Sequence, residues 1–121
     1  MSDNADVLMV YITAADAAQA AALAEHLVAR KVAACVNLLG PIQSVYEWKG
    51  RVEHASEVAL IAKTTRARYA DLEAAVREQH SYECPCIVAW PLTHGHAPFL
   101  AWASGQVLGG TPDDRRHEDP L

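Results

Sequence analysis

Two segments joined by a two-residue turn decide the fold: Ser44-Val45-Tyr46-Glu47-Trp48 leads into Lys49-Gly50, and after Arg51-Val52 comes the mostly apolar run Glu57-Val58-Ala59-Leu60-Ile61-Ala62-Lys63-Thr64. A glycine in the turn supplies the positive φ that a tight hairpin needs. Gly40-Pro41 lies inside the segment from 32 to 48 and predicts a bend or bulge, because proline lacks an amide donor. We therefore expect two long antiparallel strands, the first of them bent or divided in two.

The segments before this hairpin predict a strand and a helix. Val7-Leu8-Met9-Val10-Tyr11-Ile12-Thr13 is an apolar run of strand length, typical of a central strand. Thr13 and Asp16 suit a helix start, and apolar residues then recur at helical spacing. The first helix is expected over about 15–30.

The segments after the hairpin predict a helix, a strand and a short helix. Thr65 can cap the second helix, and Cys86-Ile87-Val88-Ala89-Trp90 is a strand bounded by prolines. Pro98 suits the first turn of a helix that reaches Gln106. The order βαββαβ plus a terminal helix is that of an α+β, ferredoxin-like sandwich.

Length and composition suit one domain. The chain has 121 residues, of which 51% are hydrophobic, and we expect a domain over 7–106 between a flexible N-terminus (1–6) and a polar tail (107–121). No apolar run approaches the roughly 20 residues that span a bilayer, and the acidic start is unlike a secretory signal, which predicts a cytoplasmic protein without membrane contact. A net charge of -5 with scattered Lys and Arg argues against nucleic acid as a partner. The three cysteines predict free thiols or thiol ligands.

Four short motifs carry a resemblance to a known family: Ala34-Cys35-Val36-Asn37, Tyr46-x-Trp48-x-Gly50, Lys63-Thr64 and His80-x-Tyr82-x-x-Pro85. In this order and spacing the chain resembles the CutA family of divalent-cation tolerance proteins. The resemblance implies a homotrimer of ferredoxin-like subunits, in which the long hairpin extends the sheet between subunits. It also implies a noncatalytic role in divalent metal ion tolerance or response, copper included. The intersubunit cleft is then expected to contain Cys35, Ser44, Tyr46, Trp48, Lys63, Tyr82, Glu83 and Trp102.

The chain departs from the family pattern at several positions. Ser81 replaces the usual proline, Cys84 an apolar or small residue, and Phe99 a frequent tyrosine. Cys86 stands where the family has a glutamate that belongs to a polar cluster near the cleft. This replacement puts a shared carboxylate-dependent chemistry in doubt for this chain.

The predicted metal ligands are His80, Cys84 and Cys86. The resemblance implies the first, because His80 matches a histidine of the family that is implicated in binding copper or other divalent metals, and the two cysteines add soft donors nearby. Imidazole binds copper and zinc, and thiolates favour Cu(I) or Zn(II). Cysteines two apart on an extended strand point the same way with Cα atoms about 6.5 Å apart, which favours metal sharing or free thiols over a disulfide. The alternatives are small hydrophobic packing for the cysteines and a helix-end surface role for His80. No metal is expected to be needed for folding.

Other residues leave their roles open. Cys35 lies on an apolar segment where core filling competes with a cleft role. Lys63 either extends to solvent or pairs with an acid such as Glu83. His94-Gly95-His96 is a second histidine pair on a predicted turn, where surface histidines usually bind nothing.

Three functions compete. The first is a trimeric transition-metal binder, and the second is a PII-like signalling scaffold that binds a small anionic metabolite near Lys63 in the intersubunit cleft. The third, a cysteine enzyme using Cys84 or Cys86 with His80, lacks support from catalytic motifs, and we expect no catalysis.

Overall fold

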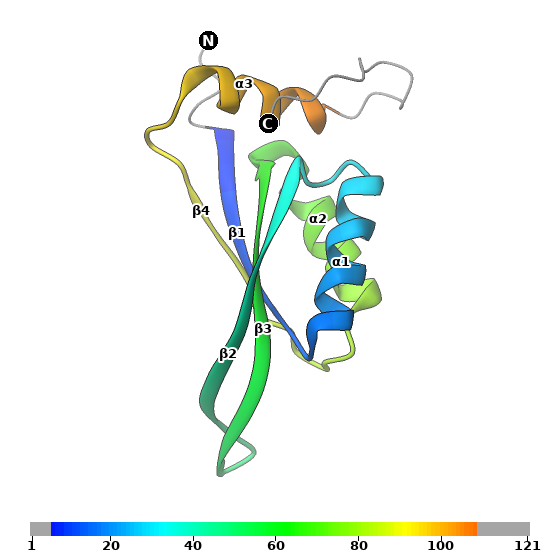
Figure 1. Cartoon of the computed structure of the whole chain (residues 1–121), viewed down its shortest axis with the longest axis vertical. Helices are drawn as coiled ribbons and strands as arrows, with labels where there is room; N and C mark the ends of the chain where they lie inside the picture. The colour runs from blue at the N-terminus through cyan, green and yellow to red at the C-terminus, as the bar shows by residue number, and fades with distance from the viewer. Residues whose placement is uncertain (1–5, 109–121) are drawn as a thin grey trace.

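The computed structural model describes residues 6–108, which form four strands and three helices (Figure 1). In chain order they are β1 (Val7–Ala14), α1 (Ala17–Ala29), β2 (Cys35–Trp48), β3 (Arg51–Thr65), α2 (Arg66–Gln79), β4 (Ile87–Pro91) and α3 (Ala97–Gln106). The predicted order of elements is confirmed. The predicted flexible N-terminus and polar tail fall mostly outside the described residues.

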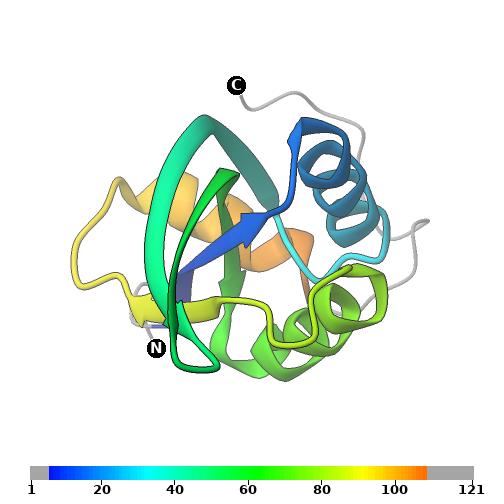
Figure 2. The same ribbon diagram turned by 90° about the horizontal axis from the view of Figure 1, so that it is seen from below.

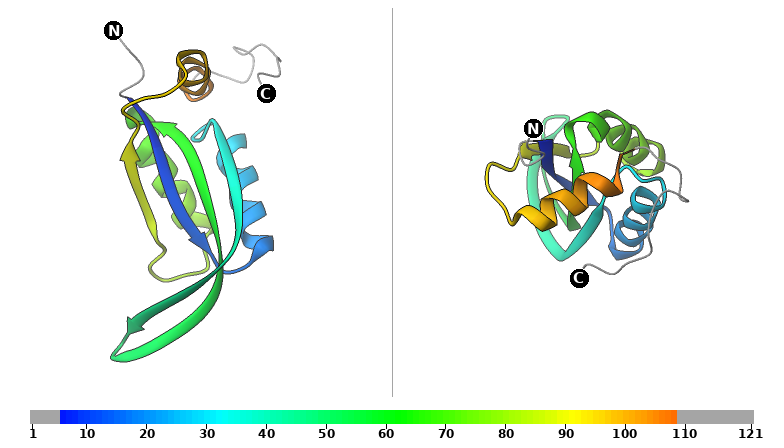
Figure 3. Two further views of the ribbon diagram at one scale, coloured as in Figure 1. Left: turned by 60° about the vertical axis from the view of Figure 1, so that its left-hand side comes forward. Right: turned by 90° about the horizontal axis from the view of Figure 1, so that it is seen from above.

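The strands form one antiparallel sheet in the order β2-β3-β1-β4. Helices α1 and α2 cover the same face of this sheet (Figures 1 and 2), as the ferredoxin-like prediction requires. Helix α3 lies across the ends of the strands (Figure 3). No helix within residues 6–108 is long and apolar enough to cross a bilayer.

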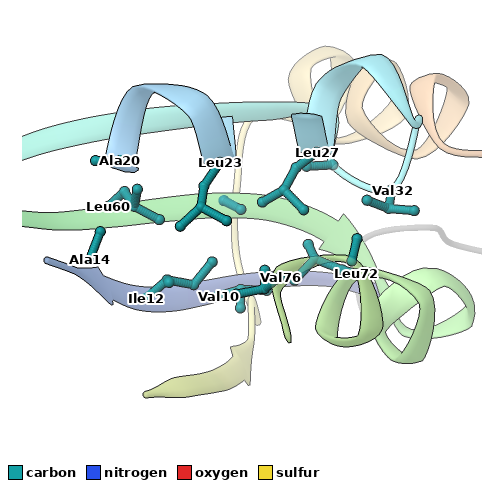
Figure 4. Packing of buried hydrophobic residues seen from close by; sticks show 13 residues of the cluster. Val10, Ile12, Ala14, Ala20, Leu23, Leu27, Val32, Leu60, Leu72 and Val76 are labelled. Atoms are coloured by element: carbon teal, nitrogen blue, oxygen red, sulfur yellow. The ribbon is translucent and has the colours of Figure 1, made fainter. Parts of the chain in front are cut away.

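The core lies between the sheet and the two covering helices (Figure 4). Alternate residues of β1 and β3 point toward the helices, as a period of two requires, and α1 and α2 each contribute an apolar stripe. Fully burying each leucine or isoleucine side chain contributes about 2 kcal/mol of hydrophobic stabilisation. The main contributors are Val10, Ile12, Leu23, Leu27, Leu60, Leu72 and Val76.

The hairpin turn has the predicted conformation. Lys49 has φ 53° and Gly50 has φ 82°, so both central residues occupy the left-handed region typical of a type I′ turn. Strand β1 ends at Ala14, which pairs with Val58. The part of the hairpin from 42 to 57, the hairpin arm, therefore extends beyond the four-stranded sheet (Figures 1 and 3).

The bend predicted at Gly40-Pro41 is a bulge in β2. Leu38 pairs with Leu60, but Gly40 pairs with the next residue, Ala59, so Leu39 is an extra residue in the ladder. Gly40 has φ 106°, which L-amino acids with a side chain rarely adopt. β2 is thus one continuous bent strand.

Several predicted boundaries need correction. Thr13 lies in β1, as its apolar run predicts, but it takes no part in the helix start. The cap of α1 is Asp16, whose Oδ1 accepts a hydrogen bond of 2.8 Å from the backbone N–H of Gln19. Thr65 does occupy the N-cap position of α2, but without a side-chain cap bond. The last strand starts after Cys86, because its ladder with β1 begins at Ile87. Val107, the first residue of the predicted tail, is buried against Ala34 and Ala103.

Candidate functional site

A buried carboxyl group lies at the root of the hairpin arm. Glu57 is only 9% exposed and accepts two hydrogen bonds, from Ser44 Oγ to Oε1 at 2.5 Å and from Tyr82 OH to Oε2 at 2.7 Å. Glu57 pairs with Ile42, so Ser44, two residues along β2, lies on the same face of the ladder. The carboxyl group thus links both strands of the hairpin to the segment between α2 and β4.

Glu57 changes the acid–base properties of its neighbours. Burial raises the pKa of Tyr82 to about 12, and the hydrogen bond to Glu57 and the charge of that carboxylate act in the same direction. Burial also raises the pKa of the Cys86 thiol, and the Glu57 charge adds to it. Without a bound cation, both the phenol and the Cys86 thiol therefore stay protonated near neutral pH.

His80, which packs against the ring of Tyr82, is held by two hydrogen bonds. Its Nε2 lies 2.7 Å from the carbonyl oxygen of Thr13, so this nitrogen carries the proton, and its Nδ1 accepts the backbone N–H of Tyr82 at 3.1 Å. The two rings pack with centroids 4.6 Å apart. Both imidazole nitrogens are already used, so metal binding by His80 would require one of these bonds to break.

The three predicted metal ligands do not form a metal-binding group in this chain. Within residues 6–108, no cluster of three or more His, Cys, Asp or Glu side chains is placed to hold a metal ion. Cys84 and Cys86 are free and exposed, but both precede β4 instead of lying on it. The common direction expected from strand geometry therefore does not apply to them. They remain two soft donors on either side of Pro85.

A second polar cluster lies further along β3. Lys63 pairs across the ladder with Cys35, and its Nζ donates a hydrogen bond to Asn37 Oδ1. Two alternatives were open for Lys63, extension to solvent or pairing with an acid such as Glu83; within one chain it contacts Asn37, and Glu83 is exposed. Burial raises the pKa of the half-buried Cys35 thiol, which the charge of Lys63 only partly offsets.

The predicted cleft residues thus occupy three places within one chain: the hairpin root, the second polar cluster and the hairpin arm. Glu57 and Lys63 are six residues apart on β3, which corresponds to about 20 Å along an extended strand. Ser44 and Tyr82 belong to the hairpin-root cluster around Glu57. Trp102 packs near Ala34, beside the second cluster. Tyr46 and Trp48 lie on the hairpin arm and are 45% and 43% exposed.

Turn residues 94–96 form no metal site either. His94 Nδ1 is 2.9 Å from Thr93 Oγ1, and His96 occupies the N-cap position of α3. A Cβ on Gly95 would come within 2.8 Å of Leu100 Cδ1. Gly95 therefore allows close packing of the turn on α3, a role different from bringing the two imidazoles together.

Sequence reasoning did not identify Glu57 or Asn37 as site residues. Both lie in strands where a polar side chain usually means a solvent-exposed position. The available signal for Glu57 was its position at the start of an apolar run, where a carboxylate needs hydrogen-bond partners if it is buried.

Comparison with known proteins agrees with the fold. Residues 8–106 match the family model described as CutA1 divalent ion tolerance protein. The divalent-cation tolerance protein CutA of Archaeoglobus fulgidus is 42% identical over 98 residues, covering 81% of this chain and 95% of the relative. The protein of the same name from Escherichia coli O45:K1 is 35% identical over 106 residues, covering 88% and 95%.

Solved structures give the same result. The crystal structure of CutA1 from Oryza sativa superposes with a TM-score of 0.85 at 31% identity, covering 90% of this chain and 100% of that chain. The structure of the periplasmic divalent cation tolerance protein CutA from Archaeoglobus fulgidus gives a TM-score of 0.81 at 40% identity, covering 84% and 98%. The protein described here belongs to the CutA1 divalent ion tolerance family.

Proposed function

We propose that this protein is a noncatalytic homotrimer that binds a soft transition-metal ion, copper in particular, through Cys84 and Cys86, and so contributes to metal tolerance. The observation that carries the proposal is the pair of exposed free thiols on either side of Pro85, beside the buried carboxyl group of Glu57. The names of the relatives, which are divalent-cation tolerance proteins, agree with a metal-related role.

The donor set favours a soft ion. Thiolates select Cu(I) and Zn(II), whereas hard ions such as Mg²⁺ prefer oxygen ligands. Two thiols suit a metal ion that accepts few ligands, or one that is completed by solvent or by a neighbouring subunit. The apolar core is complete without a metal ion, so we expect none to be required for folding.

The trimer is proposed because a single chain leaves strand edges unpaired and large apolar side chains exposed. Among residues 6–108, the two strands of the hairpin arm pair only with each other, so their outer edges present unpaired backbone groups that a second chain can cover. Large apolar side chains are exposed along this arm and on β4, the strand at the opposite edge of the sheet. They are Val45, Tyr46, Trp48, Val52, Val88 and Trp90. Apolar and aromatic exposure of this kind is typical of an interface core.

The anionic-metabolite alternative receives no comparable support. The Lys63 amine that it requires is hydrogen-bonded to Asn37 in the same chain, and the relatives compared are named for cation tolerance. For location we propose the cytoplasm, where reducing conditions keep thiols available as metal ligands. Fractionation of cells that express the untagged protein tests this location.

The metal proposal is tested by anaerobic titration of the reduced protein with Cu(I) and with Zn(II). We compare the native protein with the double variant Cys84→Ser/Cys86→Ser, with His80→Ala, and with Cys35→Ser as the matched thiol control. Tight stoichiometric binding that only the double variant loses is the expected result. Weak binding that all variants share would refute the site, and loss in Cys35→Ser would move it to the second cluster.

A further inference from the structure

We propose that Glu57 and Tyr82 couple the thiol segment, residues 84–86, to the hairpin arm, so that a change at the thiols is transmitted to the surface proposed to join subunits. This inference extends the proposed metal site, because it concerns the response to occupation of that site. It rests on a continuous chain of hydrogen bonds from the segment 80–82 to β2.

The first hydrogen bonds of this series hold residues 80 and 81, which precede the two cysteines. His80 Nε2 donates to the Thr13 carbonyl at 2.7 Å, which fixes the end of α2 to the end of β1. Gln19 Nε2 of α1 donates to Ser81 Oγ at 2.9 Å. The start of the segment is therefore anchored to two elements of the sandwich, which leaves movement at the thiols to be absorbed after residue 81.

The second part leads from this segment to the hairpin. Tyr82 is two residues from Cys84, and its hydroxyl group donates to Glu57 at 2.7 Å, while Glu57 accepts from Ser44 at 2.5 Å. Hydrogen bonds to a buried charged group are strong and costly to leave unmade. Tyr82 and Glu57 therefore tend to move together.

Glu57, which Tyr82 contacts, lies at the base of the hairpin arm. Val58 is the last residue of β3 that pairs with β1, and beyond it the hairpin continues as two strands alone. Glu57 is thus the first arm residue, placed where the direction of the arm relative to the sheet is set. From this point the arm projects beyond the sheet to its tip at Lys49 and Gly50 (Figure 3), and we expect a small displacement at its base to move the tip by a larger distance.

Glu57 also acts on the thiols through its charge. Burial raises the pKa of the Cys86 thiol, and the charge of the Glu57 carboxylate adds to it. The coupling is reciprocal. If metal binding favours one position of the arm, then an assembly that holds the arm in that position raises the metal affinity by the same factor.

The test uses a Cys35→Ser background, in which only Cys84 and Cys86 react. Hydrogen–deuterium exchange of peptides from 42–57 is measured before and after alkylation with iodoacetamide, and separately before and after addition of Cu(I). Tyr82→Phe removes only the hydroxyl group that contacts Glu57. Tyr69→Phe, which removes a hydroxyl group from α2, is the matched control.

We expect thiol modification to change the exchange rate in the arm at least twofold in the parent and in Tyr69→Phe, and to leave it unchanged in Tyr82→Phe. An unchanged arm in the parent, or an equal change in Tyr82→Phe, would overturn the coupling. If Cu(I) does not bind while alkylation still changes the arm, the proposed metal function fails and the coupling stands. If Cu(I) binds without any change in the arm, the proposed metal function stands and the coupling fails.

Discussion

At the scale of single residues, Glu57 decides the chemistry of the hairpin root. It brings together Ser44 from β2 and Tyr82 from the segment after α2, and it acts on Cys86 through its charge. The glutamate that the family pattern places at position 86 is absent, yet a carboxylate is still present in this neighbourhood. The environment of Cys86 is therefore acidic, although position 86 itself carries a thiol.

The tyrosine contact predicts a loss of stability in alkaline solution. The pKa of Tyr82 is raised to about 12 in the folded protein, whereas an unfolded tyrosine has about 10. Above pH 10 the unfolded chain loses this proton first, so the free energy of unfolding should fall between about pH 10 and 12. Urea unfolding at several pH values measures it.

Tyr82→Phe is the control for this pH dependence. It should lower the free energy of unfolding at pH 7 by about 2 kcal/mol, because the charged group loses a hydrogen bond. It should also remove part of the decline above pH 10. An unchanged alkaline decline in this variant would assign the effect to other groups.

The sequence could predict some of these residues but not others. The turn at Lys49-Gly50 could be predicted from its glycine, because a positive φ favours this residue. The partners of His80 are a backbone carbonyl and a backbone N–H, which every residue possesses and no motif marks. Glu57 is buried only because β2 and the segment after α2 both reach it, a consequence of tertiary structure.

At the scale of elements, the hairpin turn and helix α3 contain glycines that should respond in opposite ways to substitution by alanine. Gly50 has φ 82°, whereas Gly105 lies inside α3 with open space around an added Cβ. Gly50→Ala should destabilise the protein by about 1 kcal/mol, and Gly105→Ala should stabilise it by about 0.5–1 kcal/mol. Thermal unfolding of both variants checks these signs, and equal effects would contradict the assigned backbone conformations.

Helix α1 depends on its N-cap. Asp16→Ala removes the acceptor of the Gln19 backbone N–H and should lower the free energy of unfolding by about 1 kcal/mol. Asp16→Asn keeps an acceptor at this position and should recover most of that loss. If asparagine fails to rescue, the contribution of Asp16 comes from its charge and not from capping.

Element order was predictable because periodicity records which faces are buried. The boundaries were less so, since Thr13 suits both the end of a strand and the start of a helix, and Cys86 directly precedes the apolar run of β4. β1 continues through Thr13 because β3 offers it a pairing partner, Ala59. Cys86 is left out of β4 because the ladder with β1 ends at the pair Ile12 and Ile87.

At the scale of the whole molecule, one chain folds its core but leaves large apolar side chains exposed on the hairpin arm. Trp48 and Val52 are 43% and 67% exposed on this arm, far from the helices. Trp48→Asp combined with Val52→Asp should therefore leave far-UV circular dichroism unchanged and convert a trimer into monomers. Sedimentation velocity measures the change.

Ala70→Asp provides the matched control, because it adds a negative charge at an exposed position of α2 away from the arm. This variant should sediment as the native protein does. A native protein that already sediments as a monomer would refute the trimer, and a trimer that survives both arm substitutions would place the interface on another surface.

The extra residue at Leu39 imposes a limit on how this chain can change during evolution. Because side chains alternate along a strand, one additional residue exchanges the two faces of everything that follows it. Ser44 reaches Glu57 only with this offset in place. Deleting Leu39 would turn Ser44, Tyr46 and Trp48 to the opposite side without altering any of them. Insertions and deletions in β2 should therefore be accepted only in pairs that restore parity.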